Sequence, residues 1–238
     1  MTLRLAVAQP ECVAREVAAN ARAHAALVRR AADARVVLFP EMSLTGYELD
    51  APPLSPDDPR LAPLIEACPE TGAVALAGAP VAPARSASGK HIGVLAVDGS
   101  GARVAYRKMF VGGAEPEHMA PGTEPAVIEV DGVRLGLAVC KDTGVPEQAA
   151  RTAAFGIDAY LAGVLDHADE LHVQDERARR IAAGHNVWVA FASFAAPTGF
   201  GYHDAGGRSR IWSPDGRVVA AAGPRPGDLA IHTLEYAG

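Results

Sequence analysis

The chain has 238 residues, of which 49% are hydrophobic and 21% charged, so it can bury a substantial core and is not a disordered protein. A formal net charge of −6, with no basic stripe or aromatic stacking motif around the arginines, gives no reason to expect a nucleic-acid-binding protein. No apolar run is long enough to span a membrane, and the three cysteines match no zinc or disulfide pattern, which predicts a soluble, cytoplasmic protein.

The N-terminal half alternates strands and helices. Apolar residues predict a short strand at 3–8, a helix from residue 13 to about 32, and a buried strand at 35–39 that Pro40 ends. Strand, helix and strand in this order predict a parallel pair. The same patterns predict a loop at 51–59, a short helix near 61–67, strands at 73–79, 91–97 and 103–106, and a mobile connection at 86–90.

The C-terminal half repeats this alternation. A hairpin is predicted at 126–130 and 133–139, followed by a strand at 157–161, a helix from 169 to about 183 and a strand at 186–192. A second hairpin at 208–213 and 217–222 and a strand at 228–232 close the chain. Because each half has strands and two helices, we expect a single domain over residues 1–238 in which two sheets pack face to face with helices outside.

Cys140 stands at the end of the apolar strand at 133–139 and is followed at once by charged residues, Thr and Gly. A turn at such a strand end can hold a side chain above the sheet and direct backbone N–H groups at the same place, as in the nucleophile elbow of serine hydrolases. A helix predicted at 146–154 follows, and its N-terminus would favour the thiolate. The alternative is a buried structural cysteine.

Two more ionisable residues follow predicted strands: Glu41 comes just after the strand at 35–39, and Lys108 just after the strand at 103–106. Ligands of α/β sheets bind beyond the carboxyl ends of the strands, so Glu41, Lys108 and Cys140 can converge although they lie far apart in sequence. A carboxylate can take the proton of a thiol and deliver it to a leaving amine, and a lysine can stabilise an oxyanion. Taken singly, Glu41 and Lys108 would be interpreted as solvated surface residues.

Together the three residues resemble the Glu-Lys-Cys triad of the nitrilase superfamily, the carbon–nitrogen hydrolases. The resemblance rests on FPE at 39–41, YRK at 106–108 and the apolar strand that ends in Cys140, and it covers nearly the whole chain. It implies an α/β fold of the four-layer α-β-β-α sandwich type. It also implies a cofactor-free hydrolase that cleaves a non-peptide carbon–nitrogen bond of a small-molecule amide or related substrate and assembles as a homodimer or higher homo-oligomer.

The resemblance further implies roles for individual residues. Cys140 would attack the substrate and form a thioester, with Glu41 as the general base. Lys108 would stabilise the oxyanion and bias the cysteine towards the thiolate, and the backbone N–H of Lys141 would be a second oxyanion donor.

Members of the superfamily carry a second glutamate between the lysine and the cysteine. Glu115 falls at the expected offset from a Pro-Gly pair at 121–122 and would orient Lys108 and the substrate, with Glu117 as its rival. Tyr47, which ends the similar stretch at 39–47, is assigned to substrate binding.

Asp166 and His167 belong to the segment 163–168, which follows the next strand after Cys140 and is therefore expected to line the same pocket. Together with the loop after Lys108, this segment offers acidic or hydrogen-bonding groups and no arginine fork, and the arginines at 177, 179 and 180 are interpreted as a solvated helix face. These features predict a preference for a polar, neutral or cationic acyl chain over one that ends in a carboxylate. The alternative is that Asp166 and His167 only cap the helix near Asp169.

A Lys-Asp pair at 141–142 follows the cysteine where true nitrilases tend to have Trp-Glu, which points to amidase chemistry. The alternatives within the enzyme class are an N-carbamoyl amide hydrolase and a nitrilase. The alternative outside it is a catalytically silent relative that serves as a binding or assembly module, which the intact triad disfavours.

Overall fold

The computed structural model describes residues 2–83 and 89–236, so most of the predicted connection at 86–90 lies outside the described residues. The first of two six-stranded sheets contains three parallel strands that α1 (Val17–Arg30) and α2 (Ala62–Thr71) connect, and its other strands pair antiparallel with their neighbours. In spatial order its strands are β12 (Leu229–Glu235), β1 (Thr2–Ala8), β2 (Val36–Leu38), β3 (Val74–Val81), β4 (His91–Asp98) and β5 (Gly101–Arg107), with β1 to β3 parallel.

The second sheet repeats this plan. Its strands in spatial order are β11 (Val218–Ala221), β10 (Arg210–Trp212), β9 (Trp188–Ser193), β8 (Ala159–Val164), β7 (Val133–Val139) and β6 (Ala126–Val130). Here β7, β8 and β9 are parallel, and α3 (Pro146–Ala153) and α4 (Leu171–His185) connect them. The predicted β-α-β order is therefore confirmed in both halves.

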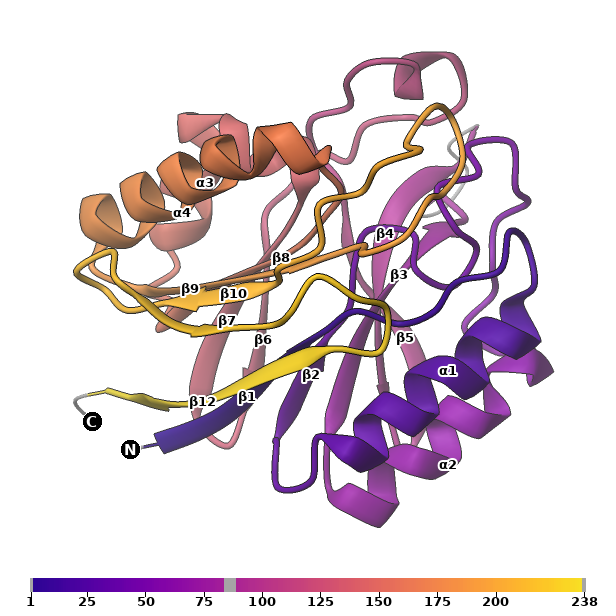
Figure 1. The fold of residues 1–238 in the computed structure, drawn as a ribbon, viewed down its shortest axis with the longest axis horizontal. Helices are drawn as coiled ribbons and strands as arrows, with labels where there is room; N and C mark the ends of the chain where they lie inside the picture. The colour runs from indigo at the N-terminus through magenta and orange to yellow at the C-terminus, as the bar shows by residue number, and fades with distance from the viewer. Residues whose placement is uncertain (1, 84–88, 237–238) are drawn as a thin grey trace.

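The two sheets lie face to face between two pairs of helices, α1 and α2 on one side and α3 and α4 on the other (Figure 1). The four-layer α-β-β-α sandwich predicted from the sequence is confirmed. The last strand, β12, crosses to the first sheet and pairs with β1 from Thr2↔Glu235 to Ala8↔Leu229, which places the two chain ends side by side (Figure 1). None of the helices in the described part of the chain has the length and apolar character needed to cross a bilayer.

The first helix begins at Val17, later than the predicted residue 13. The side chain of Asn20 accepts a hydrogen bond from the N–H of Val13 at 2.8 Å and donates one to its carbonyl oxygen at 2.8 Å. Arg15 takes a positive φ of 63° between them. Because Asn20 satisfies both backbone groups of Val13, the segment before α1 is held in an irregular turn instead of a helix.

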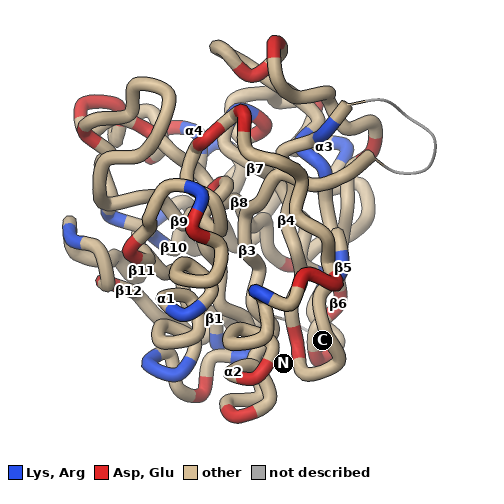
Figure 2. The backbone as a smooth tube through the Cα atoms, turned by 90° about the vertical axis from the view of Figure 1, so that its right-hand side faces the viewer, with Lys and Arg blue, Asp and Glu red and all other residues tan. Residues whose placement is uncertain are grey.

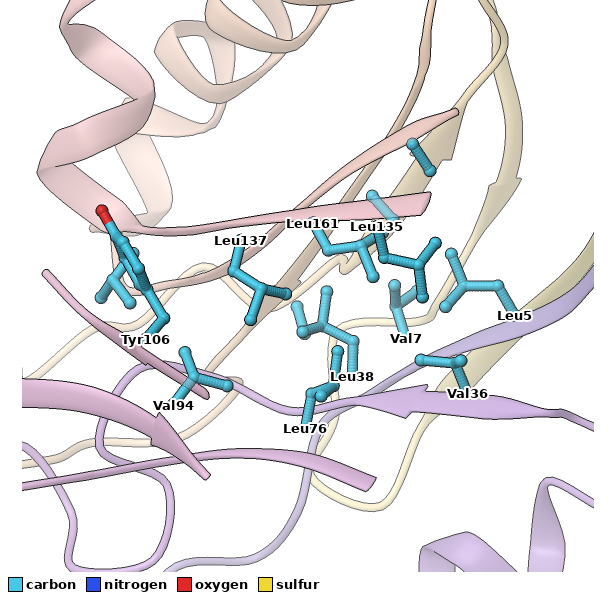
Figure 3. Packing of buried hydrophobic residues seen from close by; sticks show 14 of the residues in the cluster. Leu5, Val7, Val36, Leu38, Leu76, Val94, Tyr106, Leu135, Leu137 and Leu161 are labelled. Carbon is cyan, nitrogen blue, oxygen red and sulfur yellow. The ribbon is translucent and has the colours of Figure 1, made fainter. Parts of the chain in front are cut away.

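Apolar side chains fill three spaces between the four layers. Leu5, Leu38 and Leu76 of the first sheet meet Leu135 and Leu161 of the second in the central space (Figure 3). Separate clusters fill the spaces between each sheet and its own helices. Lys, Arg, Asp and Glu are absent from β3 and β8 and concentrate on helices and loops (Figure 2).

The carboxyl ends of several strands meet at one edge of the sandwich. β5 runs in the same direction as β3, because β4 between them is antiparallel to both. The segments that follow β2, β5, β7 and β8 therefore leave their sheets at strand carboxyl ends, where ligands of α/β proteins bind.

Candidate active site

Lys108 lies at the centre of the site. It follows β5 directly, and its side chain is only 1% exposed. The ammonium Nζ donates to Oε1 of Glu41 at 2.7 Å and to Oε1 of Glu115 at 2.6 Å. One buried cation thus joins two carboxylates that come from different loops.

Glu115 is held by both of its carboxylate oxygens. Oε1 also accepts from the hydroxyl of Tyr47 at 2.7 Å, and Oε2 accepts from the N–H of Gly112 at 2.8 Å. Glu115 is buried at the start of a 3₁₀ turn, Glu115–Glu117, whereas Glu117 is exposed. Of the two glutamates that the sequence left open, Glu115 is therefore the one that contacts Lys108.

Glu41 lies in a tight turn between the two sheets, two residues after Phe39, and is 1% exposed. A Cβ atom at Gly163 of β8 would lie 2.8 Å from the backbone nitrogen of Glu41 and 2.7 Å from the carbonyl oxygen of Phe39. A Cβ atom at Gly78 of β3 would overlap the backbone nitrogen of Met42. Glycines from both sheets therefore make the space that this turn occupies.

Cys140 begins a 3₁₀ turn, Cys140–Gly144, with a φ of 40°. Positive φ is uncommon for a residue with a Cβ atom, and the side chain of Cys140 is half-buried. Sγ lies 3.4 Å from the carbonyl oxygen of Leu165, and the thiol is close enough to Glu41 for the two groups to shift each other's pKa. α3 begins at Pro146, as the sequence predicts, after the 3₁₀ turn that Cys140 opens, and the effect of its N-terminus on the thiolate stays a prediction.

Asp142 fixes the turn that carries Cys140. Its Oδ2 accepts from the hydroxyl of Tyr106 at 2.8 Å and from the N–H of Val139 at 2.9 Å, and its Oδ1 accepts from the N–H of Phe110 at 2.9 Å. These bonds connect the end of β7 with the segment around Lys108. The sequence analysis gave Asp142 no such role.

Burial controls the protonation of the thiol and the carboxylate. Burial raises the pKa of Glu41, Lys108 lowers it and Glu115 raises it again, which leaves it at about 7. Burial and the charge of Glu41 raise the pKa of Cys140 well above its ordinary value, and Lys108 lowers it only in part. The thiol is therefore neutral at rest, because the predicted effect of Lys108 is outweighed by burial.

Lys108 itself stays charged. Burial alone would lower its pKa, but the charges of Glu41, Cys140 and Glu115 act in the opposite direction and raise the pKa above its ordinary value. The site therefore holds a permanent ammonium beside a neutral thiol and a carboxylate that can exchange a proton near neutral pH.

Cys140 faces a cavity of about 440 Å³. Asp166 and His167 line it as the sequence predicts, and so do Tyr47 and Lys141. The backbone N–H of His167 donates to Oε2 of Glu170 at 3.2 Å, whereas the side chain of His167 lines the cavity. The other lining residues are Lys108, Gly112, Gly113, Ala114, Glu115, Leu165, Glu170, Arg177, Phe200, Gly201 and Tyr202.

Tyr202 contributes an aromatic wall that the sequence analysis did not identify. Its ring stacks on His167 with ring centroids 4.6 Å apart and an interplanar angle of 14°, and it meets Tyr47 edge-on at 5.2 Å. The hydroxyl of Thr198 accepts a hydrogen bond from the N–H of Tyr47 at 2.9 Å. The loop between β9 and β10 therefore holds Tyr47 and His167 in place.

Arg177 gives the pocket a positive charge that the sequence did not predict. It lines the cavity from α4, with a side chain 25% exposed and Nη1 4.0 Å from Oδ1 of Asp166. Its neighbour Arg180 donates to the carbonyl oxygen of Thr143 at 2.8 Å. Arg179 and Arg180 are exposed as predicted, but α4 packs against the turn Cys140–Gly144 and brings Arg177 to the cavity, so the expectation of a pocket without arginine is wrong.

Comparison with known proteins agrees with the fold. Residues 4–237 match the model of the carbon-nitrogen hydrolase family. The hydrolase in the pqqF 5' region of Pseudomonas protegens is 29% identical over 238 residues, an alignment that covers 93% of this chain and 79% of that protein.

Two solved structures share the fold. Saccharomyces cerevisiae Nit3, a member of branch 10 of the nitrilase superfamily, superposes with a TM-score of 0.86 at 21% identity, over 98% of this chain and 90% of that chain. A cysteine-to-alanine mutant of the amidase from Nesterenkonia sp. AN1, in complex with butyramide, superposes with a TM-score of 0.85 at 24% identity, over 98% and 90% of the two chains.

Proposed function

Because the chain belongs to the carbon–nitrogen hydrolase family, we propose that it hydrolyses the amide bond of a small molecule with Cys140 as the nucleophile. In this proposal Glu41 is the general base and Lys108 the cation that stabilises the oxyanion. The observation that carries the proposal is the bonding of Lys108 to Glu41 at 2.7 Å and to Glu115 at 2.6 Å, beside a thiol that faces a cavity.

The first step is attack of Sγ of Cys140 on the carbonyl carbon of the amide. The thiol is neutral at rest, so it must lose its proton as the carbon–sulfur bond forms. The carboxylate of Glu41 lies near enough to this thiol to raise its pKa and has a pKa of about 7 itself, which suits it to take that proton near neutral pH.

The carbonyl oxygen becomes an oxyanion as the tetrahedral intermediate forms. The ammonium of Lys108 supplies a fixed positive charge, and the backbone N–H of Lys141 supplies a second donor in the turn after the nucleophile. Glu115 and Tyr47 do not react; they hold Lys108 in position through the bonds at 2.6 and 2.7 Å.

Collapse of the intermediate breaks the carbon–nitrogen bond. Glu41 returns the proton to the departing nitrogen, ammonia leaves, and Cys140 carries the acyl group as a thioester. Water then attacks the thioester while Glu41 accepts one of its protons. The carboxylic acid is released, and the proton held by Glu41 restores the thiol.

An ammonia-release screen over primary amides, N-carbamoyl amines and nitriles tests this function. Butyramide belongs in the screen because the Nesterenkonia amidase mutant, a fold neighbour, is in complex with it. We expect release from amides by the wild-type protein and none from the Cys140→Ala protein. Release from nitriles or carbamoyl amines alone would replace the amidase assignment with one of those activities, and equal release by the Cys140→Ala protein would overturn the mechanism.

A further inference from the structure

We propose that the substrate of this site carries a carboxylate, which Lys141 and Arg177 bind in the cavity. The inference rests on the proposed function, because it names the substrate class of the same site. It reverses the preference for neutral or cationic substrates that the sequence alone suggested.

The acidic side chains of the cavity wall already accept hydrogen bonds from the protein. Glu115 accepts from Lys108, Tyr47 and Gly112. Oδ2 of Asp166 accepts from the side-chain amide of Gln174 at 2.6 Å. These carboxylates therefore have few acceptor sites left for a cationic group of a substrate.

The two cations that line the cavity beside Lys108 lack such partners. Among the described residues, neither the ammonium of Lys141 nor the guanidinium of Arg177 makes a hydrogen bond. The carboxylate within reach of Arg177 is that of Asp166, and its 4.0 Å separation exceeds hydrogen-bonding distance. Both cations are therefore available to an anion that enters the cavity.

Two glycines leave room for the cationic side chains beside the segments that follow Lys108 and Cys140. A Cβ atom at Gly112, in the loop after Lys108, would come within 3.3 Å of Cδ of Lys141. A Cβ atom at Gly144, in the turn after Cys140, would come within 3.3 Å of Cζ of Arg177. The absence of side chains at these two positions leaves room for one cation beside each segment.

This arrangement suits a carboxylate better than an uncharged polar group. A guanidinium presents paired N–H donors that match the two oxygens of a carboxylate, and a part-buried cation is screened less by salt than an exposed one. The carboxylate can lie on the acyl side of the amide or on the amine side. The experiment therefore includes both arrangements.

The acyl-side arm compares monoamides of dicarboxylic acids, from malonamate to adipamate, with the corresponding diamides. Because a diamide has two equivalent bonds that can be cleaved, its measured rate is divided by two before the comparison. The amine-side arm compares N-butyrylglycine with N-butyrylethylamine. We expect kcat/KM to be at least about tenfold higher for the charged member in one arm. Arg177→Gln and Lys141→Met should each reduce that ratio about tenfold, whereas Arg179→Gln, an exposed position of the same helix outside the cavity, should leave it unchanged.

A binding measurement separates this inference from the proposed function. Calorimetry of the Cys140→Ala protein uses both pairs, glutaramate with glutaramide and N-butyrylglycine with N-butyrylethylamine. In one of them the charged member should bind at least about tenfold more tightly, and the difference should be lost in the Cys140→Ala/Arg177→Gln protein. If amides are hydrolysed but charge matters in neither arm nor in binding, the carboxylate inference is wrong and the function stands. If no amide is hydrolysed while the Arg177-dependent binding is present, the anion site stands and the proposed function fails.

Discussion

The ammonium of Lys108 lies 2.7 Å from Oε1 of Glu41, and each of the two side chains is 1% exposed. Ions buried to this extent lose most of their hydration, so their attraction must be supported by further bonds, which Glu115 and Tyr47 supply here. A pair of this kind adds little to stability when it is intact, but removal of one partner leaves the other charge buried without compensation.

Replacement of Lys108 by Met should therefore destabilise the protein as well as inactivate it. We expect the free energy of unfolding to fall by about 3–5 kcal/mol at neutral pH, because Glu41 and Glu115 lose their cation. Lys108 lowers the pKa of Glu41, so its removal raises that pKa further above 7.

The sign of the pH dependence follows from this shift. A carboxyl group whose pKa is raised by folding stabilises the folded state below its ordinary pKa of 4.5, and that stability is lost as the pH rises through the folded pKa. The defect of Lys108→Met in urea denaturation should thus be small in acid and grow above pH 7, and Glu115→Gln should restore part of it. A defect of equal size at every pH would contradict the buried ion network.

The rate of hydrolysis should rise with pH through about 7, because Glu41 must be ionised to take the proton of Cys140. No descending limb from Lys108 is expected at moderately alkaline pH, since its neighbours raise its pKa. The measurement is kcat/KM of a primary amide across this range. A rate that is flat, or that falls as the pH passes 7, would show that Glu41 is not the base.

Asp142→Asn should lower kcat far more than it changes KM. The substitution leaves one acceptor oxygen where Asp142 uses two to bind Tyr106, Val139 and Phe110, so the turn that carries Cys140 should shift. Loss of one or two of these buried bonds should cost about 1–3 kcal/mol of stability. Tyr106→Phe is the matched control, because it removes one of the three bonds to Asp142, together with the bonds that the hydroxyl accepts from Met109 and Gln148, and leaves the two backbone bonds of Asp142. Equal losses of kcat in both variants would argue against a role for the turn.

Gly163→Ala should displace Glu41 without touching the substrate. The added Cβ atom would lie 2.8 Å from the backbone nitrogen of Glu41, and overpacking of this kind costs about 1–3 kcal/mol. Gly184→Ala on α4 is the control, because no atom lies within 4 Å of the added carbon, and it should stabilise the helix by roughly 0.5–1 kcal/mol. Denaturation and kcat of both variants test the pair, and unchanged activity in Gly163→Ala would show that the turn tolerates movement.

The proposed catalytic residues could be located from the sequence because each follows a predicted strand. Strand ends are readable from local patterns, and β2, β5 and β7 place Glu41, Lys108 and Cys140 at one edge of the sandwich once the strand directions are known. The offset from Pro121-Gly122 favoured Glu115 and left Glu117 as its rival; both lie in the same short turn, and the burial and hydrogen bonds of Glu115 distinguish them in the structure.

Arg177 and Asp142 could not be placed from the sequence for a different physical reason. The amphipathic pattern of α4 says which face is polar, but not that this polar face packs over the turn after Cys140. A buried carboxylate such as Asp142 has no local signal, because its partners at Phe110 and Tyr106 come from another strand and loop. The homodimer and the cytoplasmic location stay predictions.

The central claim is that the acyl group of the substrate is transferred to Cys140, and peptide mapping of the acylated enzyme tests it most directly. An activated ester, p-nitrophenyl butyrate, should acylate the protein faster than the thioester is hydrolysed, so that acid quenching traps the intermediate. The account predicts a burst of p-nitrophenol and one butyryl group on the peptide that contains Cys140, with neither in the Cys140→Ala protein. A butyryl group on another residue, or an undiminished burst from the Cys140→Ala protein, would contradict it.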